Sequence, residues 1–303
     1  MTADQQSRAG LLYGLGAYLM WGFLPIYFKA LAAVGPTEIV AHRIVWSLFF
    51  LAALVGIWKR WPAVRAALGS RVLLTLVITA ALIGINWLVW IWAVTNGHVL
   101  EGSLGYYLNP LVNVLLGVVL LGERLTPART FAVLLAAAGV AVLAFGAGDG
   151  LWISLTLAAS FALYGYVRKV APVEAVEGLA IETAVLLPVA GLYVAVLGAT
   201  GAGTFGSEGP RHAVLLALSG LVTAVPLLAF GAAASRIPLT TLGLLQYLAP
   251  TIQFLLGITL FGEPLPLLKL VGFVLVWAGL ALFTADLVRH HRRTSRPAVP
   301  APA

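Results

Sequence analysis

The sequence contains no cysteine and few charged residues. Without a thiol, the chain can form no disulfide, no thiolate metal site and no cysteine nucleophile. Asp, Glu, Lys and Arg make up 10% of the residues, whereas a soluble domain carries about 25%. The zinc-protease, P-loop and serine-hydrolase motifs are also missing, and the neighbouring His290 and His291 lack metal-ligand spacing. We therefore expect neither a metal nor a cofactor.

The chain is instead rich in apolar residues. Hydrophobic residues make up 61% of it, and its mean hydropathy is +1.00. Apolar segments of about twenty residues recur, which is the length needed to cross roughly 30 Å of hydrocarbon. These segments predict an all-α integral membrane protein with ten transmembrane helices, at residues 10–32, 38–57, 72–94, 99–121, 127–146, 150–168, 177–198, 212–234, 239–261 and 266–287.

One long apolar segment occurs twice. Residues 104–125 align without a gap on residues 244–265, with Leu104 on Leu244. The positions identical in both copies are Leu104, Tyr107, Leu108, Pro110, Leu115, Leu116, Gly117, Leu120, Gly122, Glu123 and Leu125. This duplication predicts two five-helix repeats, 10–146 and 150–287. An odd number of spans in each repeat inverts the second relative to the first, an arrangement typical of secondary transporters.

The basic residues indicate the orientation in the membrane. One side holds most of them: Arg8, Lys59, Arg60, Arg65, Arg71, Arg124, Arg129, Arg168, Lys169, Arg236, Arg289, Arg292, Arg293 and Arg296. The other side holds Lys29, Arg211 and Lys269. The positive-inside rule then places both termini, the segment 1–9 and a disordered basic tail at 288–303, in the cytoplasm. Because the net charge of +7 is spread between apolar runs and the tail, it does not indicate nucleic acid.

Several stretches resemble a known family. They are GLGAYLMWGFLPIYFKAL (14–31), EIVAHRIVWSLFF (38–50), INWLVWIWAV (85–94), EGSLGYYLNPLVNVLLGVVLLGER (101–124), ALYGYVRK (162–169) and TAVPLLAFGAAASRIPLTTLGLLQYLAPT (223–251). Over residues 8–290 the chain resembles the drug/metabolite transporter superfamily, its EamA-type ten-helix members, and among these the RarD group, named for chloramphenicol sensitivity. The resemblance implies a multi-pass protein of the bacterial inner membrane that exports small metabolites or drugs, without naming a substrate.

Ionisable residues inside the spans are the first site candidates, because burying a charge in lipid is costly. His42 and Arg43 lie in the second span. In the functional interpretation, Arg43 binds an anionic group or pairs with Glu101, and His42 changes charge with pH. In the structural interpretation, these residues form an ion pair that anchors the outer mouth.

Glu182 is the repeat counterpart of His42. It is a candidate for binding a proton or a cationic group. The alternative is a structural partner for Arg168 or Lys169 at the inner boundary. Proton coupling, if the transporter has it, would use Glu101, Glu182 or His42.

Polar residues and a central proline mark the fourth and ninth spans. Pro110 and Pro250 are expected to kink these helices, because proline cannot donate to the carbonyl four residues earlier. Residues at helical spacing place a polar stripe on each: Tyr106, Asn109, Asn113, Gln246 and Gln253. The stripe predicts the lining of a midplane cavity, with hydrogen-bonded packing between helices as the alternative.

Aromatic residues supply candidate walls for a substrate. Trp87, Trp90 and Tyr107 are expected to line the cavity, with Asn86 one turn from Trp90. Tyr247, the repeat counterpart of Tyr107, and Tyr164 complete the set of candidates. Trp58 and Trp61 flank the basic loop, and we expect them at the headgroup level.

These patterns predict a secondary transporter that works by alternating access on a small molecule, with proton coupling as one option. The rivals are an intramembrane enzyme acting on lipid-linked substrates and a non-transporting membrane sensor. An enzyme would need a nucleophile–base pair or paired carboxylates, whereas the acids here are scattered. We expect the lipid bilayer and a small-molecule substrate as partners, no nucleic acid, and either a monomer or a homodimer.

Overall fold

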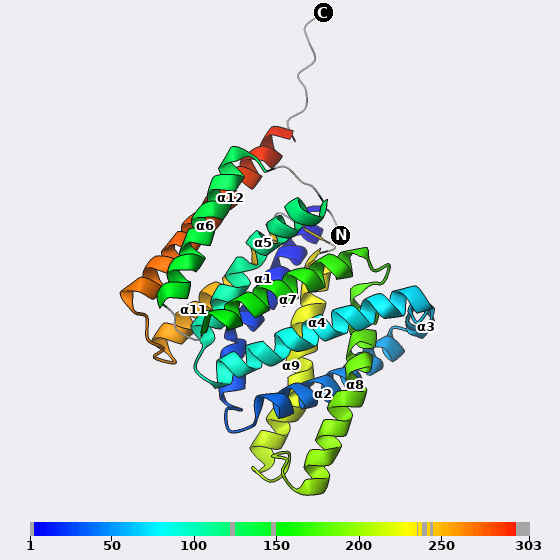
Figure 1. Cartoon of the computed structure of the whole chain (residues 1–303). Coiled ribbons are helices and arrows are strands. Elements are labelled where there is room, and N and C mark those ends of the chain that lie inside the picture. The colour runs from blue at the N-terminus through cyan, green and yellow to red at the C-terminus, as the bar shows by residue number, and fades with distance from the viewer. Residues whose placement is uncertain are drawn as a thin grey trace, which may run out of the picture.

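The computed structural model describes residues 3–121, 125–146, 150–234, 236–237, 241–242 and 245–294. This part of the chain contains helices and turns and no strand. The helices, shown in Figure 1, are α1 (Ala3–Lys29), α2 (Pro36–Ile57), α3 (Trp61–Ala67), α4 (Ser70–Thr95), α5 (Val99–Leu121), α6 (Pro127–Gly146), α7 (Leu151–Val170), α8 (Ala175–Thr200), α9 (Pro210–Ala234), α11 (Leu248–Thr259) and α12 (Leu267–Thr294). The all-α prediction is confirmed for these residues.

Seven of these helices are long and apolar enough to cross a membrane. They contain the segments Gln5–Lys29, Pro36–Ile57, Val72–Thr95, Pro127–Ala144, Val176–Thr200, Pro210–Ala233 and Leu267–Asp286. Helices α5, α7 and α11 occupy the three other ranges expected to span, and α11 is an apolar helix of 12 residues. The chain is therefore a multi-pass membrane protein, and the crossing of all ten segments stays a prediction.

The short helix α3 was not expected from the sequence. It lies within the basic loop after α2, where Pro62 occupies its first turn and so needs no helical hydrogen-bond partner. Trp58 and Trp61 beside it are 51% and 46% exposed. Exposed tryptophans next to a basic loop are what a membrane–water interface favours.

Most helices of one half pack on helices of the other half. Helix α1 packs on α9 and α11, and its counterpart 140 residues later, α7, packs on α4 and α5. In the same way the contact of α2 with α9 corresponds to that of α8 with α4. Helices α6 and α12 pack on each other and lie side by side at one edge of the bundle (Figure 1). Each half thus completes the other instead of forming a separate bundle.

A carboxylate joins the halves at one end of α5. Glu263 accepts hydrogen bonds from the backbone nitrogens of Val99 at 2.7 Å and Leu100 at 2.9 Å, which have no partner within their own helix. Gly262 before it has φ +65°, a conformation that glycine adopts without strain. The repeated Gly-Glu pair is therefore a capping device in this half, and its first copy, Gly122-Glu123, lies outside the described residues.

The two central prolines act differently. Pro110 lies inside the continuous helix α5. Pro250, by contrast, lies in the first turn of α11, directly after a turn at Gln246 and Tyr247. At Pro250 the helical path is interrupted at Gln246 and Tyr247 and α11 starts anew, and the nitrogen of a first-turn proline needs no carbonyl partner.

Gly220 provides a test of the packing between α2 and α9. A Cβ at this position would lie 2.4 Å from the backbone carbonyl carbon of Trp46, whereas a Cβ at Gly16 in α1 would meet nothing within 4 Å. We expect Gly220→Ala to lower the free energy of unfolding by about 1–3 kcal/mol through overpacking. Gly16→Ala, the control, should leave it equal or slightly higher because alanine favours the helix. Thermal unfolding in detergent measures both, and an equal midpoint for the two variants would contradict the close approach.

Candidate functional site

Arg43 is a buried cation surrounded by four helices. Its side chain leaves α2 and is 5% exposed. Its Nε donates a hydrogen bond of 2.6 Å to Oγ1 of Thr223 in α9. The guanidinium carbon lies 4.3 Å from the ring centroid of Trp87 in α4 and 5.7 Å from that of Phe28 in α1. Cation–π contact and a hydroxyl acceptor hold the guanidinium plane in place.

No carboxylate neutralises this cation among the described residues. Its Nη1 atom is buried without a hydrogen-bond partner. The expected pairing with Glu101 is not formed, because Glu101 binds Nζ of Lys269 at 2.6 Å and lies 3.6 Å from Nδ1 of His98. A buried charge without a counter-charge is strongly unfavourable. The arrangement therefore leaves a cationic donor free to receive an anionic group.

His42 faces away from Arg43. Its ring stacks on Phe205 with a centroid distance of 4.8 Å, and its Nε2 lies 3.9 Å from Oε1 of Glu38. Glu38 in turn accepts a 2.7 Å hydrogen bond from the backbone nitrogen of Thr204. Because successive helical residues point about 100° apart, two neighbours in sequence reach different surroundings. The single His42–Arg43 site expected from the sequence is therefore divided.

Tyr106 and Asn86 form a fully bonded node beside Arg43. The Tyr106 hydroxyl donates to Oδ1 of Asn86 at 3.1 Å. Asn86 Nδ2 donates to the Leu157 carbonyl at 3.1 Å and to Ser160 at 3.0 Å. Asn86 is thus an anchor between α4, α5 and α7.

Aromatic rings connect this node to the second charged site. Tyr106 packs edge-on against Trp90 at 5.2 Å and against Phe161 at 6.0 Å. Phe161 lies 6.1 Å from Tyr164, whose hydroxyl donates to Oε2 of Glu182 at 3.3 Å. Trp90 and Tyr164 were predicted from the sequence, and the structure places them in one aromatic series with Tyr106.

Glu182 is 1% exposed and has a complete set of partners. Thr79 donates to it at 2.7 Å, and Nε of Arg168 lies 3.4 Å away. The pairing with Arg168, named as the alternative role, is therefore formed. The absence of a side chain at Gly178 permits it, since a Cβ there would lie 1.8 Å from a guanidinium nitrogen of Arg168. Unlike Arg43, Glu182 is a satisfied buried ion.

Tyr107 and Tyr247 belong to a different part of the core. They stack at 6.4 Å, and the Tyr107 hydroxyl shares a 2.7 Å hydrogen bond with Thr251 of α11. Tyr107 also packs edge-on against Trp277 at 5.9 Å. The expected wall of Trp87, Trp90 and Tyr107 is wrong for Tyr107, because neighbouring residues on α5 point about 100° apart and it is Tyr106 that meets Trp90.

The residues of the polar stripe differ in burial and in hydrogen bonding, and their role in lining a cavity stays a prediction. Asn109 is 1% exposed, and neither atom of its amide has a hydrogen-bond partner. Gln253 donates from Nε2 to the Trp21 carbonyl at 3.0 Å, while its Oε1 stays unpartnered. Gln246 lies in the turn before α11, and the side chain of Asn113 lies outside the described residues. Asn109 and Gln253 therefore keep buried amide atoms that a polar ligand can satisfy.

Two threonines of these sites were missed in the sequence. Thr79 and Thr223 hold Glu182 and Arg43, yet isolated hydroxyls within apolar runs give no periodic signal. The 140-residue repeat offset does not single them out either, because their counterparts are Ser219 and Ile83. Over the described residues, no group of three His, Asp or Glu side chains converges to hold a metal ion.

The chain is similar to a family of bacterial membrane proteins. Residues 8–145 match the EamA-like transporter family. Protein RarD of Streptomyces exfoliatus is 50% identical over 97% of this chain and 94% of its own. Protein RarD of Escherichia coli (strain K12) is 44% identical over 96% and 99%. A chloramphenicol-sensitive protein RarD of Pseudomonas aeruginosa is 35% identical over 96% and 98%.

A solved structure adds a likeness in fold. A crystal structure of a protein superposes with a TM-score of 0.58 over 91% of this chain and 98% of the other, at 20% identity. At that identity the likeness concerns the fold alone. The full-length sequence relatives are therefore what establish kinship, and they agree with the apolar helices that the protein is a multi-pass bacterial membrane protein.

Asn86→Ala tests the anchoring role of this residue. The change leaves the Tyr106 hydroxyl without its acceptor and removes two contacts to α7, so we expect a loss of about 1–3 kcal/mol in the free energy of unfolding. Asn96→Ala is the control, because Asn96 is exposed and donates only to neighbours in sequence. Thermal unfolding compares them. Equal midpoints would show that Asn86 does not hold α4 to α7.

Proposed function

The chain belongs to the RarD group of the EamA-like transporter family, and on that premise we propose that it exports small anionic metabolites or drugs across the bacterial inner membrane by alternating access. Membership of this family supports a membrane transporter, and we add the direction of transport, the substrate class and the mechanism. The guanidinium of Arg43 and the aromatic rings of Trp87 and Phe28 beside it favour a compact substrate that combines an acidic group with a flat apolar body.

The contacts between helices support two inverted repeats, 10–146 and 150–287. When each helix of the first half is replaced by its counterpart, the main contacts of α1, α2 and α5 become those of α7, α8 and α11. Five spans per half would insert the second half with the opposite orientation. Rocking one half against the other would then open a central site to alternate faces of the membrane.

The buried, unneutralised guanidinium of Arg43 is the observation that carries the binding site. Its Nη1 has no partner, while Nε binds Thr223 and the guanidinium lies over Trp87, so an anionic group could satisfy Nη1 while the rest of the ligand packs on rings. The unpartnered amides of Asn109 and Gln253 would supply further polar contacts. A transporter gains from a charge that only its substrate neutralises, because occupancy then changes the energy of the interior.

Glu182 is the candidate for proton coupling in this proposal. Arg43 and Glu182 each lie two turns into their helices, α2 and α8, which are repeat counterparts. Inverted repeats would place these sites near opposite faces, with Tyr106, Phe161 and Tyr164 between them. Protonation of Glu182 would weaken its pairing with Arg168 and so loosen α7 from α8. Glu101, bound to Lys269, and His42, stacked on Phe205, are further from this series.

Flux into proteoliposomes tests the site at Arg43. A panel of organic anions, amino acids and amphenicol drugs is offered to the wild type and to Arg43→Met. We expect saturable uptake in the wild type and at least a tenfold loss in the variant, because the anion loses its charge-assisted contact. The melting temperature should stay equal or rise, since an uncompensated buried charge is replaced by an apolar side chain of similar length.

The exposed Arg211 provides the control, as Arg211→Met should transport normally. A large fall in melting temperature for Arg43→Met with ordinary flux would instead make Arg43 a structural residue. Ligand binding without flux for every compound in the folded wild type would favour the sensor, and chemical conversion of a lipid-linked compound would favour the enzyme.

Glu182→Gln tests proton coupling. The amide keeps the hydrogen bonds with Thr79 and Tyr164 but cannot take up a proton, so we expect flux to lose its dependence on a pH gradient while exchange at equal pH persists. His42→Ala is the matched comparison and should keep the gradient dependence. Reversed results for the two variants would move the coupling site to the outer loop.

A further inference from the structure

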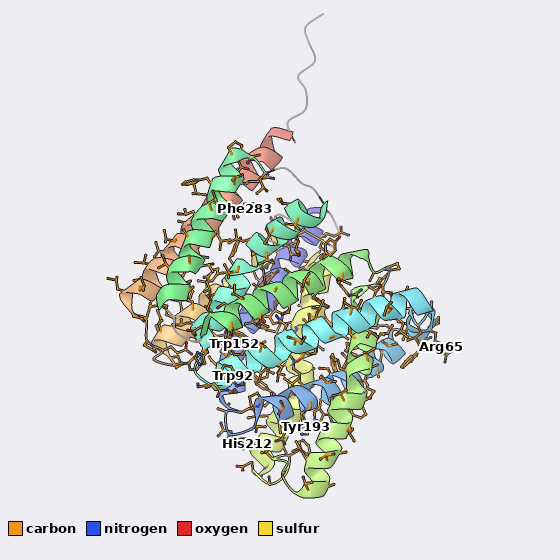
Figure 2. The ribbon with its side chains drawn as sticks, in the orientation of Figure 1. Arg65, Trp92, Trp152, Tyr193, His212 and Phe283 are labelled. Atoms are coloured by element: carbon orange, nitrogen blue, oxygen red, sulfur yellow. The ribbon has the colours of Figure 1, made fainter. Side chains whose placement is uncertain are left out.

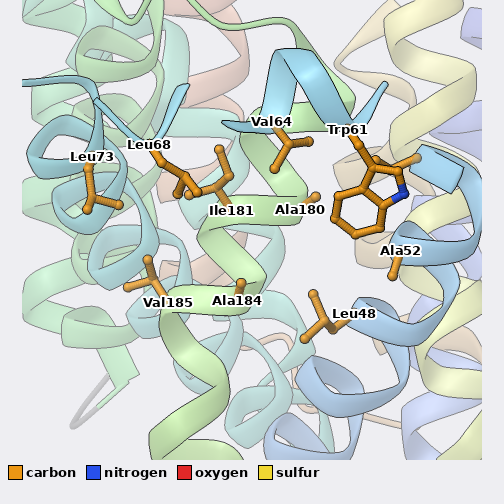
Figure 3. Close-up of a pocket in the computed structure, with 11 residues that line it drawn as sticks. Leu48, Ala52, Trp61, Val64, Leu68, Leu73, Ala180, Ile181, Ala184 and Val185 are labelled. Atoms are coloured by element: carbon orange, nitrogen blue, oxygen red, sulfur yellow. The ribbon is translucent and has the colours of Figure 1, made fainter. Parts of the chain in front are cut away.

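A cavity of about 280 Å³ opens between α2, α3, α4 and α8 (Figure 3). Its lining side chains are all apolar, and three of them, Ala52, Ala180 and Ala184, are small. Trp61 and Val64 of α3 complete the lining, with Trp61 beside Ala52 and Ala180 (Figure 3). Because nothing in this lining can hydrogen-bond from its side chain except the Trp61 indole, water gains little by entering it. The natural occupant is a hydrocarbon chain.

The three alanines of the cavity are not repeated in the other half of the chain. The repeat counterparts of Ala52, Ala180 and Ala184 are Leu192, Val40 and Ile44. Each is a larger side chain, and Val40 and Ile44 are buried, whereas Leu192 is 67% exposed. The small side chains and the covering helix α3 are therefore particular to this half, since residues 201–207, the counterparts of α3, form a loop.

Two exposed basic residues, Lys59 and Arg65, lie close in sequence to the residues of α3 that line the cavity. Lys59 precedes the lining residue Trp61, and Arg65 follows the lining residue Val64; both are exposed, and neither has an ion-pair partner in the described part of the chain. Figure 2 shows Arg65 at the outer edge of the bundle beside α3. The neighbouring Arg60 is engaged elsewhere, with Glu177 and Glu174.

We propose that this cavity binds one acyl chain of an anionic phospholipid whose phosphate contacts Lys59 and Arg65. Exposed tryptophans on both sides of Lys59 match the headgroup level, and each basic residue near a membrane surface favours anionic lipid. The bound chain touches Ile181, which directly precedes Glu182, so occupancy fixes the turn of α8 that holds the buried ion. The site itself does not depend on the proposed transport function.

Lipid-dependent stability of the purified full-length protein tests the proposal. The protein is placed in nanodiscs of dioleoyl-phosphatidylglycerol or dioleoyl-phosphatidylcholine, which share acyl chains and differ in charge. We expect a higher melting temperature with phosphatidylglycerol and a bound copy retained in native mass spectra. Lys59→Gln with Arg65→Gln should abolish the difference and weaken phosphatidylglycerol binding by roughly fivefold for each charge removed. Arg211→Gln, an exposed charge at the other end of the bundle, is the control.

A second variant separates the acyl chain from the headgroup. Ala180→Val with Ala184→Ile introduces the residues of the other half, and we expect it to lower the retention of both lipids. Equal melting temperatures in the two lipids for the wild type would overturn the proposal. So would full retention of phosphatidylglycerol by the filled variant, or an equal stabilisation by glycerol 3-phosphate alone, which would mean that the cavity plays no part.

Discussion

Hydrocarbon offers no hydrogen-bond partner, and this constraint governs every polar side chain in the structure. Asn86 meets it by joining three helices, Glu182 by collecting Thr79, Tyr164 and Arg168, and Glu263 by capping α5. Arg43 differs from these residues, because it is a buried cation with one nitrogen unpartnered and no carboxylate beside it among the described residues; the buried amides of Asn109 and Gln253 also keep unpartnered atoms. Glu182 has a counter-charge and hydrogen-bond donors, whereas Arg43 has no counter-charge among the described residues, and this difference makes Arg43 the candidate binding residue.

The repeated half-sequence explains why these polar contacts cross the molecule. Thr223 in the second half holds Arg43 of the first, and Thr79 in the first half holds Glu182 of the second. Each charged group therefore lies against helices from both halves. A relative movement of the halves would change both environments together, which is the coupling that alternating access requires.

The sequence predicted the helices well and the neighbours less well. Apolar length placed a helix at each expected range, since the thickness of a membrane leaves few alternatives. Periodicity named Trp90, Tyr106 and Tyr164 as separate candidates without grouping them, and it joined Trp90 to Tyr107 and His42 to Arg43, whereas the structure places Trp90 against Tyr106 and His42 against Phe205. One residue along a helix changes the facing side, and sequence alone does not show which partner each side meets. The partner of Glu101, Lys269, lies too far along the chain for any local pattern to reveal.

The exchanged packing of α1 and α7 has a consequence for biogenesis. Helix α1 is made first but packs on α9 and α11, which leave the ribosome only after most of the chain has been inserted. Until then its inward face, including Gly10, Gly14 and Gly22, has no partner helix to meet. The order of synthesis therefore requires the first helix to wait in the bilayer or at the insertion machinery, and the native bundle closes around it last.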